Sequence, residues 1–139
     1  MIRTSFICFL ILLLVFNFCH ETEGKIHFMS KHTIRIYSSL PTNSPQLILH
    51  CFSKDDDFGN HTLSHGSVFG WHFRVNMFGT TKYRCDFWWG KKAKRIAVFY
   101  GVWDIDSYHH TYNYFVHTYG LIVKHDQETQ ESPFEEWDD

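Results

Sequence analysis

The sequence predicts an all-β protein: a small antiparallel β-sandwich of about seven to eight strands behind a cleavable signal peptide. Three observations support this prediction. Aromatic residues make up 19% of the 139-residue chain and occur with Val, Ile and Thr in short runs. Gly, Pro, Asn and Asp separate these runs, as in strands joined by tight turns. No long stretch has helical periodicity, and short strands at this spacing are typical of a two-sheet sandwich.

The N-terminal segment has the features of a secretory leader. Arg3 supplies a positive charge, and every residue from Phe6 to Phe16 is apolar. This run is shorter than the roughly 20 residues that a bilayer-spanning helix needs, and its length fits a signal peptide. Small residues favour cleavage after Gly24. Cleavage nearer Cys19 and a retained membrane anchor are the alternatives. We therefore predict a signal peptide over residues 1–24, secretion, and no transmembrane segment in the mature protein.

The chain beyond the leader contains seven segments with strand character. Their bounds are Thr33–Leu40, Gln46–Ser53, Val68–Val75, Thr80–Trp88, Arg95–Trp103, Tyr112–His117 and Leu121–His125. Within the second and fourth segments apolar and polar residues alternate, so each segment has one face suited to the core. The sequence shows no internal repeat, and residues 25–125 form one predicted domain.

Cysteine usage predicts a single disulfide in the mature domain. Of the four cysteines, Cys8 and Cys19 lie in the leader, which leaves Cys51 and Cys85. Both fall on the apolar face of their strands, and an oxidising compartment favours a bridge. Two buried free thiols are the alternative. A bridge of this span stabilises by roughly 4 kcal/mol through loop length alone.

The C-terminal residues 126–139 have a different composition from the domain. They contain seven acidic residues and no Lys or Arg, which predicts a largely solvated acidic tail. Phe134 and Trp137 are the residues expected to attach part of this tail to the sandwich. The whole chain has a net charge of −2, which argues against a nucleic-acid partner. We expect a monomer.

Several blocks of sequence carry a family resemblance. They are Thr33–Leu40, the run Leu47–Gly59 with its His-Cys, Ser-Lys and Asp-Asp-x-Gly elements, Gly70–Phe73, Phe78–Thr81 and Tyr83-x-Cys85. Over Thr33–Val123 the chain resembles the plant self-incompatibility S-protein family. Phe58 stands where the family pattern has Leu. Members commonly carry a second cysteine pair, and Tyr108–Val123 has none, which leaves the rigidity of the last strands open.

The resemblance implies a small extracellular sandwich that acts by being recognised. We therefore expect a secreted ligand of a cell-surface receptor, of unknown identity, in communication between cells. A polar loop over Lys54–Asn60 contains Asp55, Asp56 and Asp57, which are candidate receptor contacts. Calcium binding is the alternative for these carboxylates, although Asp before Gly commonly serves only to form a turn. The sequon that begins at Asn60 predicts N-glycosylation there.

A basic turn between the fourth and fifth predicted strands is the preferred contact. Lys91, Lys92, Lys94 and Arg95 crowd this turn, either as a solvated tip or as a docking patch for an anionic partner. Trp88 and Trp89 precede it. An exposed tryptophan pair would suit the alternative function, a secreted cell-wall glycan-binding sandwich.

Histidines are abundant, and their protonation at acidic pH would make the domain more positive. His109, His110, His117 and His125 form the candidate zinc set, with ordinary surface positions as the other reading. No nucleophile motif accompanies them. The sequence therefore predicts no catalytic residues, no metal, no cofactor and no enzymatic activity.

Overall fold

The computed structural model describes residues 30–104, 109–126 and 132–138. The predicted signal peptide therefore lies outside the described residues. The described strands are β1 (Lys31–Ser38), β2 (Leu47–Phe52), β3 (Asp57–Leu63), β4 (Val68–Arg74), β5 (Lys82–Trp89), β6 (Lys92–Tyr100), β7 (Thr111–His117), β8 (Gly120–His125) and β9 (Ser132–Glu135). A 3-10 helix, η1, spans Gly101–Asp104. No helix within the described residues is long and apolar enough to cross a membrane.

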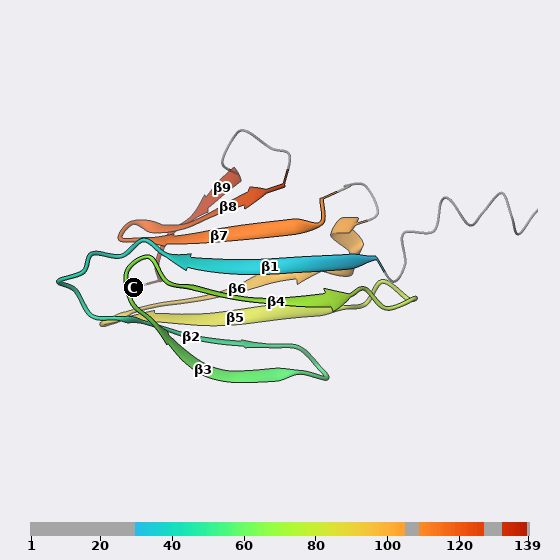
Figure 1. Ribbon diagram of the computed structural model, residues 1–139, viewed down its shortest axis with the longest axis horizontal. Helices are drawn as coiled ribbons and strands as arrows, with labels where there is room; N and C mark the ends of the chain where they lie inside the picture. The colour runs from blue at the N-terminus through green and yellow to red at the C-terminus, as the bar shows by residue number, and fades with distance from the viewer. Residues whose placement is uncertain (1–29, 105–108, 127–131, 139) are drawn as a thin grey trace, which may run out of the picture.

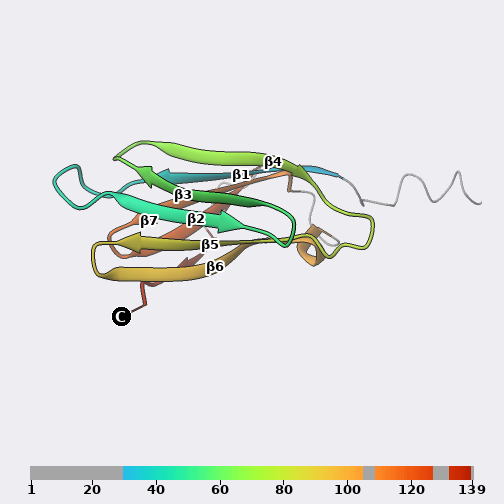
Figure 2. The same cartoon turned by 90° about the horizontal axis from the view of Figure 1, so that it is seen from below.

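The strands form two sheets that pack face to face, which confirms the predicted β-sandwich (Figure 1, Figure 2). One sheet has the order β4-β1-β7-β8-β9, and the other has the order β3-β2-β5-β6. Tyr114 of β7 links the layers, because its hydroxyl donates a hydrogen bond to the Val98 carbonyl of β6 at 2.5 Å. Burial raises the pKa of this tyrosine, so the hydroxyl keeps its proton and remains a donor.

One strand pair is parallel, which differs from the expected purely antiparallel arrangement. β1 lies between β4 and β7, antiparallel to β4 and parallel to β7. In this register Thr33 is paired with Thr111. The hydrophobic pattern of a strand sets which face is buried but not the direction of its neighbours, so sequence alternation did not reveal this pairing.

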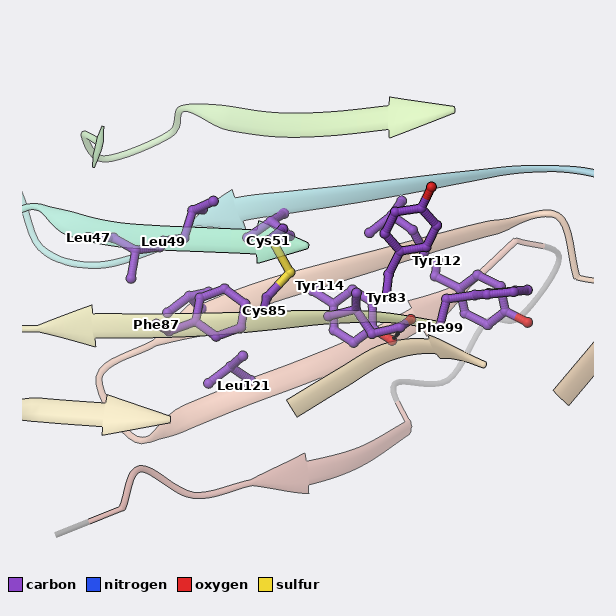
Figure 3. Close-up of a cluster of buried hydrophobic side chains, with 14 of the residues drawn as sticks. Leu47, Leu49, Cys51, Tyr83, Cys85, Phe87, Phe99, Tyr112, Tyr114 and Leu121 are labelled. Atoms are coloured by element: carbon purple, nitrogen blue, oxygen red, sulfur yellow. Dashed lines mark hydrogen bonds between the residues drawn. A yellow bond between two sulfur atoms is a disulfide. The ribbon is translucent and has the colours of Figure 1, made fainter. Parts of the chain in front are cut away.

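The core lies between the sheets and is formed by the alternating positions that the sequence indicates. Leu47, Leu49 and Phe87 are fully buried, and Cys51 and Cys85 form a disulfide. The two cysteines are directly paired across β2 and β5. Figure 3 shows this bridge among the buried side chains.

Aromatic side chains fill one part of the core as a connected cluster. The Phe73 ring centroid lies 4.7 Å from that of Tyr83 and 4.8 Å from that of Phe99. The Phe58 ring centroid lies 4.9 Å from that of Trp71. Such ring pairs add about 0.5–1.5 kcal/mol beyond the burial of their area, which accounts for the high aromatic content of so small a domain.

The structure corrects the predicted bounds of two regions. Asp57–Leu63 forms strand β3, so the polar loop after β2 ends at Asp56 rather than Asn60. Gly59 and Asn60 gave this stretch a loop-like composition, but tertiary pairing with β2 overrides that weak preference. In the second region β6 spans Lys92–Tyr100, and Gly101–Asp104 is a 3-10 helix. The predicted strand Arg95–Trp103 therefore began and ended too late in the sequence.

Part of the C-terminal segment packs on the sandwich, as expected for Trp137, and it includes a strand that was not predicted in the largely solvated tail over residues 126–139. Ser132–Glu135 forms β9, which pairs with β8. Trp137 is only 8% exposed, and its indole N–H donates a hydrogen bond to the His117 carbonyl at 2.9 Å. The side chain of Phe134 lies outside the described set. The sandwich therefore extends beyond His125, because one buried aromatic ring outweighs the surrounding acidic composition.

Candidate functional site

The loops lie at two ends of the sandwich, which Figure 1 shows at the left and right of the view. The groove end carries the β2–β3 turn and the β4–β5 loop. The hairpin end carries the β5–β6 hairpin and the C-terminus. The acidic and basic contact candidates therefore lie at opposite ends and do not form one surface.

At the groove end, polar groups of the acidic turn hold its own backbone. The Ser53 amide donates to the Asp56 carbonyl at 2.7 Å, and the Asp56 amide donates to the Ser53 hydroxyl at 3.0 Å. The Asp56 carboxylate accepts a hydrogen bond from the Tyr83 hydroxyl at 3.0 Å. Burial, reinforced by this carboxylate, raises the pKa of Tyr83 to about 12. Of the turn's two carboxylates, the exposed Asp55 is the more available to a partner.

Asp57 belongs to the start of β3. Its carboxylate accepts a hydrogen bond from the Gly59 amide at 2.9 Å and lies 2.5 Å from His50 Nε2. The Gly59 amide, followed by His50, lowers the pKa of this carboxyl. Gly59 has φ of 70°, which favours glycine. Asp57 thus ties β3 to β2 and, unlike Asp55, is a structural residue.

A groove opens beside this turn. It has a volume of about 670 Å³ and lies between the Ser53–Asp56 turn and the β4–β5 loop. Its charged lining residues are Lys54, Asp55, Asp56, Arg74, Lys82 and Arg84. This site was not predicted from the sequence, because its cations come from the β2–β3 turn, the end of β4 and the start of β5, which only the fold brings together.

The rim of the groove presents two apolar side chains to solvent. Phe78 is 79% exposed and Met77 is 60% exposed. The loop beneath them is well braced: Asn76 hydrogen-bonds Thr80 through both its side-chain oxygen and its side-chain nitrogen. The Asn76 amide also donates to the Thr81 hydroxyl at 2.9 Å. The sequence signal for this rim is the apolar pair Met77-Phe78, which stands between the turn-forming residues Asn76 and Gly79.

At the hairpin end, the basic turn is shorter than predicted. Trp89 pairs with Lys92, so only Gly90 and Lys91 form the turn. Lys92, Lys94 and Arg95 belong to β6. The register of a two-residue turn explains the difference, since β6 starts directly after it.

Two of the four basic residues are already paired within the molecule. The Lys94 ammonium lies 3.1 Å from Asp138 and 3.5 Å from Glu135. These carboxylates, chiefly Asp138, raise its pKa. Arg95 makes two hydrogen bonds to the Asp86 carboxylate, at 2.5 and 2.9 Å. The exposed Lys91 and Lys92 remain as contact candidates at this end.

The C-terminal clasp, which we define as Glu135–Asp138, covers the side of this hairpin. The Asp138 amide donates to the Ala93 carbonyl of β6 at 2.9 Å. The Trp137 ring centroid lies 6.0 Å from that of Trp89. Through these contacts the clasp joins the β9 side of one sheet to the β6 edge of the other.

The two tryptophans of the glycan-binding alternative have different surroundings. Trp89 packs on the clasp and donates a hydrogen bond to the Ser44 hydroxyl at 3.2 Å. Trp88 is the outward residue, with 38% of its surface exposed. The strand therefore does not present a tryptophan pair on one face.

Asn60 occupies an exposed position in β3, the edge strand of its sheet. It pairs with His50 of β2 rather than lying in the predicted loop. An edge strand has one side open to solvent, so this position is compatible with a glycan. N-glycosylation of Asn60 remains a prediction.

The late histidines are engaged in packing. The His109 and His125 rings are stacked with centroids 4.8 Å apart, and His117 stacks on Tyr119 at 4.9 Å. His109 Nδ1 donates to the Asp126 carbonyl at 2.9 Å. Over residues 30–104, 109–126 and 132–138, no group of three His, Cys, Asp or Glu side chains is placed to hold a metal ion.

The fold and site together define a small, disulfide-linked β-sandwich protein whose most distinctive surface chemistry lies in its end loops. Residues 33–137 match the family model described as plant self-incompatibility protein S1. The chain belongs to this family.

Curated relatives and a solved structure agree with this assignment. S-protein homolog 29 of Arabidopsis thaliana is 39% identical over 87 residues, which are 61% of this chain and 59% of that protein. S-protein homolog 27 of the same plant is 35% identical over 99 residues, 68% of this chain and 60% of that protein. The chain thus spans about three fifths of the length of these relatives. A solved SPH (self-incompatibility protein homologue) structure has a TM-score of 0.62 at 18% identity, covering 78% of this chain and 96% of that one.

Proposed function

We propose that this protein is a secreted ligand that a cell-surface receptor recognises through an end of the sandwich. Its similar solved structure represents small, highly stable, secreted plant proteins. The predicted leader and the Cys51–Cys85 disulfide support the same compartment for this chain. In this proposal the protein acts by binding and carries out no reaction.

The observation that carries the proposal is the exposed rim at the groove end. Phe78 and Met77 project from a braced loop of a rigid scaffold and leave most of their surface in water. Loops held in this way commonly carry binding function, and aromatic residues and Met are enriched at protein interfaces. Asp55 at this end and Lys91 and Lys92 at the hairpin end are the further contact candidates.

A binding experiment on cells tests the proposal and its alternative together. Labelled mature protein is crosslinked to intact plant cells and to protoplasts, with heat-denatured protein as the control. We expect binding to protoplasts that is lost after brief protease treatment of the cell surface. Binding that disappears with the wall and resists protease would contradict the receptor proposal and favour the cell-wall glycan.

Secretion itself has a separate test. Residues 1–24 fused to a reporter are expected to direct it to the extracellular fluid with the leader removed. A reporter that stays in the cytosol with Met1 retained would refute this part of the proposal.

A further inference from the structure

We propose that the groove between the Ser53–Asp56 turn and the β4–β5 loop binds an acidic segment of a protein partner. The inference rests on the proposed function in one respect: it assigns this segment to the receptor. The binding chemistry can be tested without the receptor.

The lining of the groove carries more positive than negative charge. Four cationic side chains line it, from Lys54, Arg74, Lys82 and Arg84, against the carboxylates of Asp55 and Asp56. A cleft with an excess of one sign of charge attracts ligands of the opposite sign.

Three of the four cations are not paired with a carboxylate within the part of the chain that the structure describes. No carboxylate there lies within ion-pair distance of Lys54, Lys82 or Arg84. Lys94 and Arg95, by contrast, both have carboxylate partners. A ligand that brings carboxylates to the groove would give its cations the ion-pair partners that Lys94 and Arg95 already have within the fold.

The fold also fixes the position of one of these cations without removing its charge. Lys82 lies over the Tyr100 ring, with its ammonium 5.1 Å from the ring centroid. Such a cation–π contact orients the ammonium and leaves its positive charge available to an anion.

An exposed apolar side chain beside the cations distinguishes a protein segment from an acidic polysaccharide. Phe78 lines the groove together with the cations and is 79% exposed, and Met77, its neighbour in the chain, is 60% exposed. A polyuronate offers carboxylates and no apolar side chain, whereas a peptide offers both. The volume of about 670 Å³ lies within the usual range of pockets for small ligands, roughly 300–1,000 Å³. The occupant is therefore a short acidic stretch with an apolar residue beside it.

The test uses fluorescent twelve-residue peptides with four Glu and one Leu, or with Gln in place of each Glu. Fluorescence anisotropy measures their binding to the purified secreted protein at low salt. We expect the Glu peptide to bind at least tenfold more tightly than the Gln peptide. Lys54→Glu with Arg84→Glu should weaken it at least tenfold. The matched reversal Arg35→Glu with Lys124→Glu, at two cations that do not line the groove, should change it less than twofold. Near-UV circular dichroism confirms that both variants are folded. Equal binding by all three proteins would overturn the inference.

Protoplast binding then separates this inference from the proposed function. Wild-type protein that binds the Glu peptide through the groove but no cell would contradict the receptor proposal alone. Cell binding that survives the groove reversal and excess Glu peptide would overturn the groove assignment alone. Competition by polygalacturonate and not by the Glu peptide would also overturn it, since the partner would then be a polysaccharide.

Discussion

The hairpin end and the groove end of the sandwich both gather basic residues, and ion pairs engage two of the four at the hairpin end. There, Lys94 and Arg95 have carboxylate partners and the clasp covers the neighbouring strand edge. At the groove end Lys54 and Arg84 lack such partners among the described residues, and the rim residue Phe78 is mostly in water. The comparison shows that the density of charge in a sequence does not locate a recognition surface, because pairing within the fold decides which charges a partner can use.

The largest effect expected from this comparison comes from removing an aromatic residue at each end. Trp137→Ala should destabilise the protein by about 3–5 kcal/mol, because it leaves a cavity and removes the anchor of the clasp. Phe78→Ala should change stability by less than about 0.5 kcal/mol, since that side chain is 79% exposed. Urea unfolding of both variants measures the difference. Similar losses would show that the groove rim is structural and remove the distinction between the ends.

Substitutions at two glycines test how tightly the clasp is packed. A Cβ at Gly120 would lie 2.2 Å from the Glu135 carbonyl oxygen, and its φ is 144°. Gly120→Ala should therefore displace β9 and destabilise by about 2–3 kcal/mol. Gly90→Ala is the control, with φ of 58° and only Pro45 nearby at 3.6 Å, and should lose about 1 kcal/mol. Thermal unfolding ranks the two variants, and the reverse order would contradict a tightly packed clasp.

Charge reversal at neighbouring lysines tests the pairing at the hairpin end. Lys94→Glu should destabilise by about 1 kcal/mol, because the new carboxylate faces Asp138 and Glu135. Lys92→Glu at an exposed position should stay within about 0.5 kcal/mol. Denaturant titrations at low and high salt compare them. A loss at Lys94 that is insensitive to salt would argue against an electrostatic origin.

The smallest effect concerns Asp57 at the groove end. Its pKa is below the ordinary value of 3.8, so the ionised carboxylate stabilises the fold above that pH. This contribution is lost as the pH falls through the lowered pKa. Asp57→Asn should slightly lower the melting temperature at pH 6, and the difference from wild type should shrink toward pH 2. A difference that is constant with pH would show that ionisation of Asp57 does not contribute.

The sequence predicted those parts of the fold that depend on alternation. The inward positions of β2 and β5, and with them the Cys51–Cys85 bridge, follow from period-two patterning. It missed β3 because Gly59 and Asn60 have poor strand propensity, and it missed β9 because acidic residues surround it. Both are edge strands whose formation depends on a neighbour already in place.

The groove was less predictable than the fold for a different reason. Lys54 lies in the turn after β2, Arg74 ends β4 and Arg84 lies in β5, and no local pattern relates them. The hairpin lysines, in contrast, are adjacent in sequence and were easily noticed. The carboxylate partners of Lys94, Glu135 and Asp138, come from a distant segment. Its ion pairs therefore could not be predicted from the local sequence either.

The parallel pairing of β1 with β7 has a consequence for synthesis. Domains fold as the chain emerges from its N-terminus, and the sheet of β3, β2, β5 and β6 is complete once Tyr100 has left the ribosome. β1 must then wait for Thr111–His117 before it gains its second neighbour. Pairings between such distant segments are slow to form. The first strand to emerge is thus among the last to be enclosed, and the clasp forms only after Trp137 has been added.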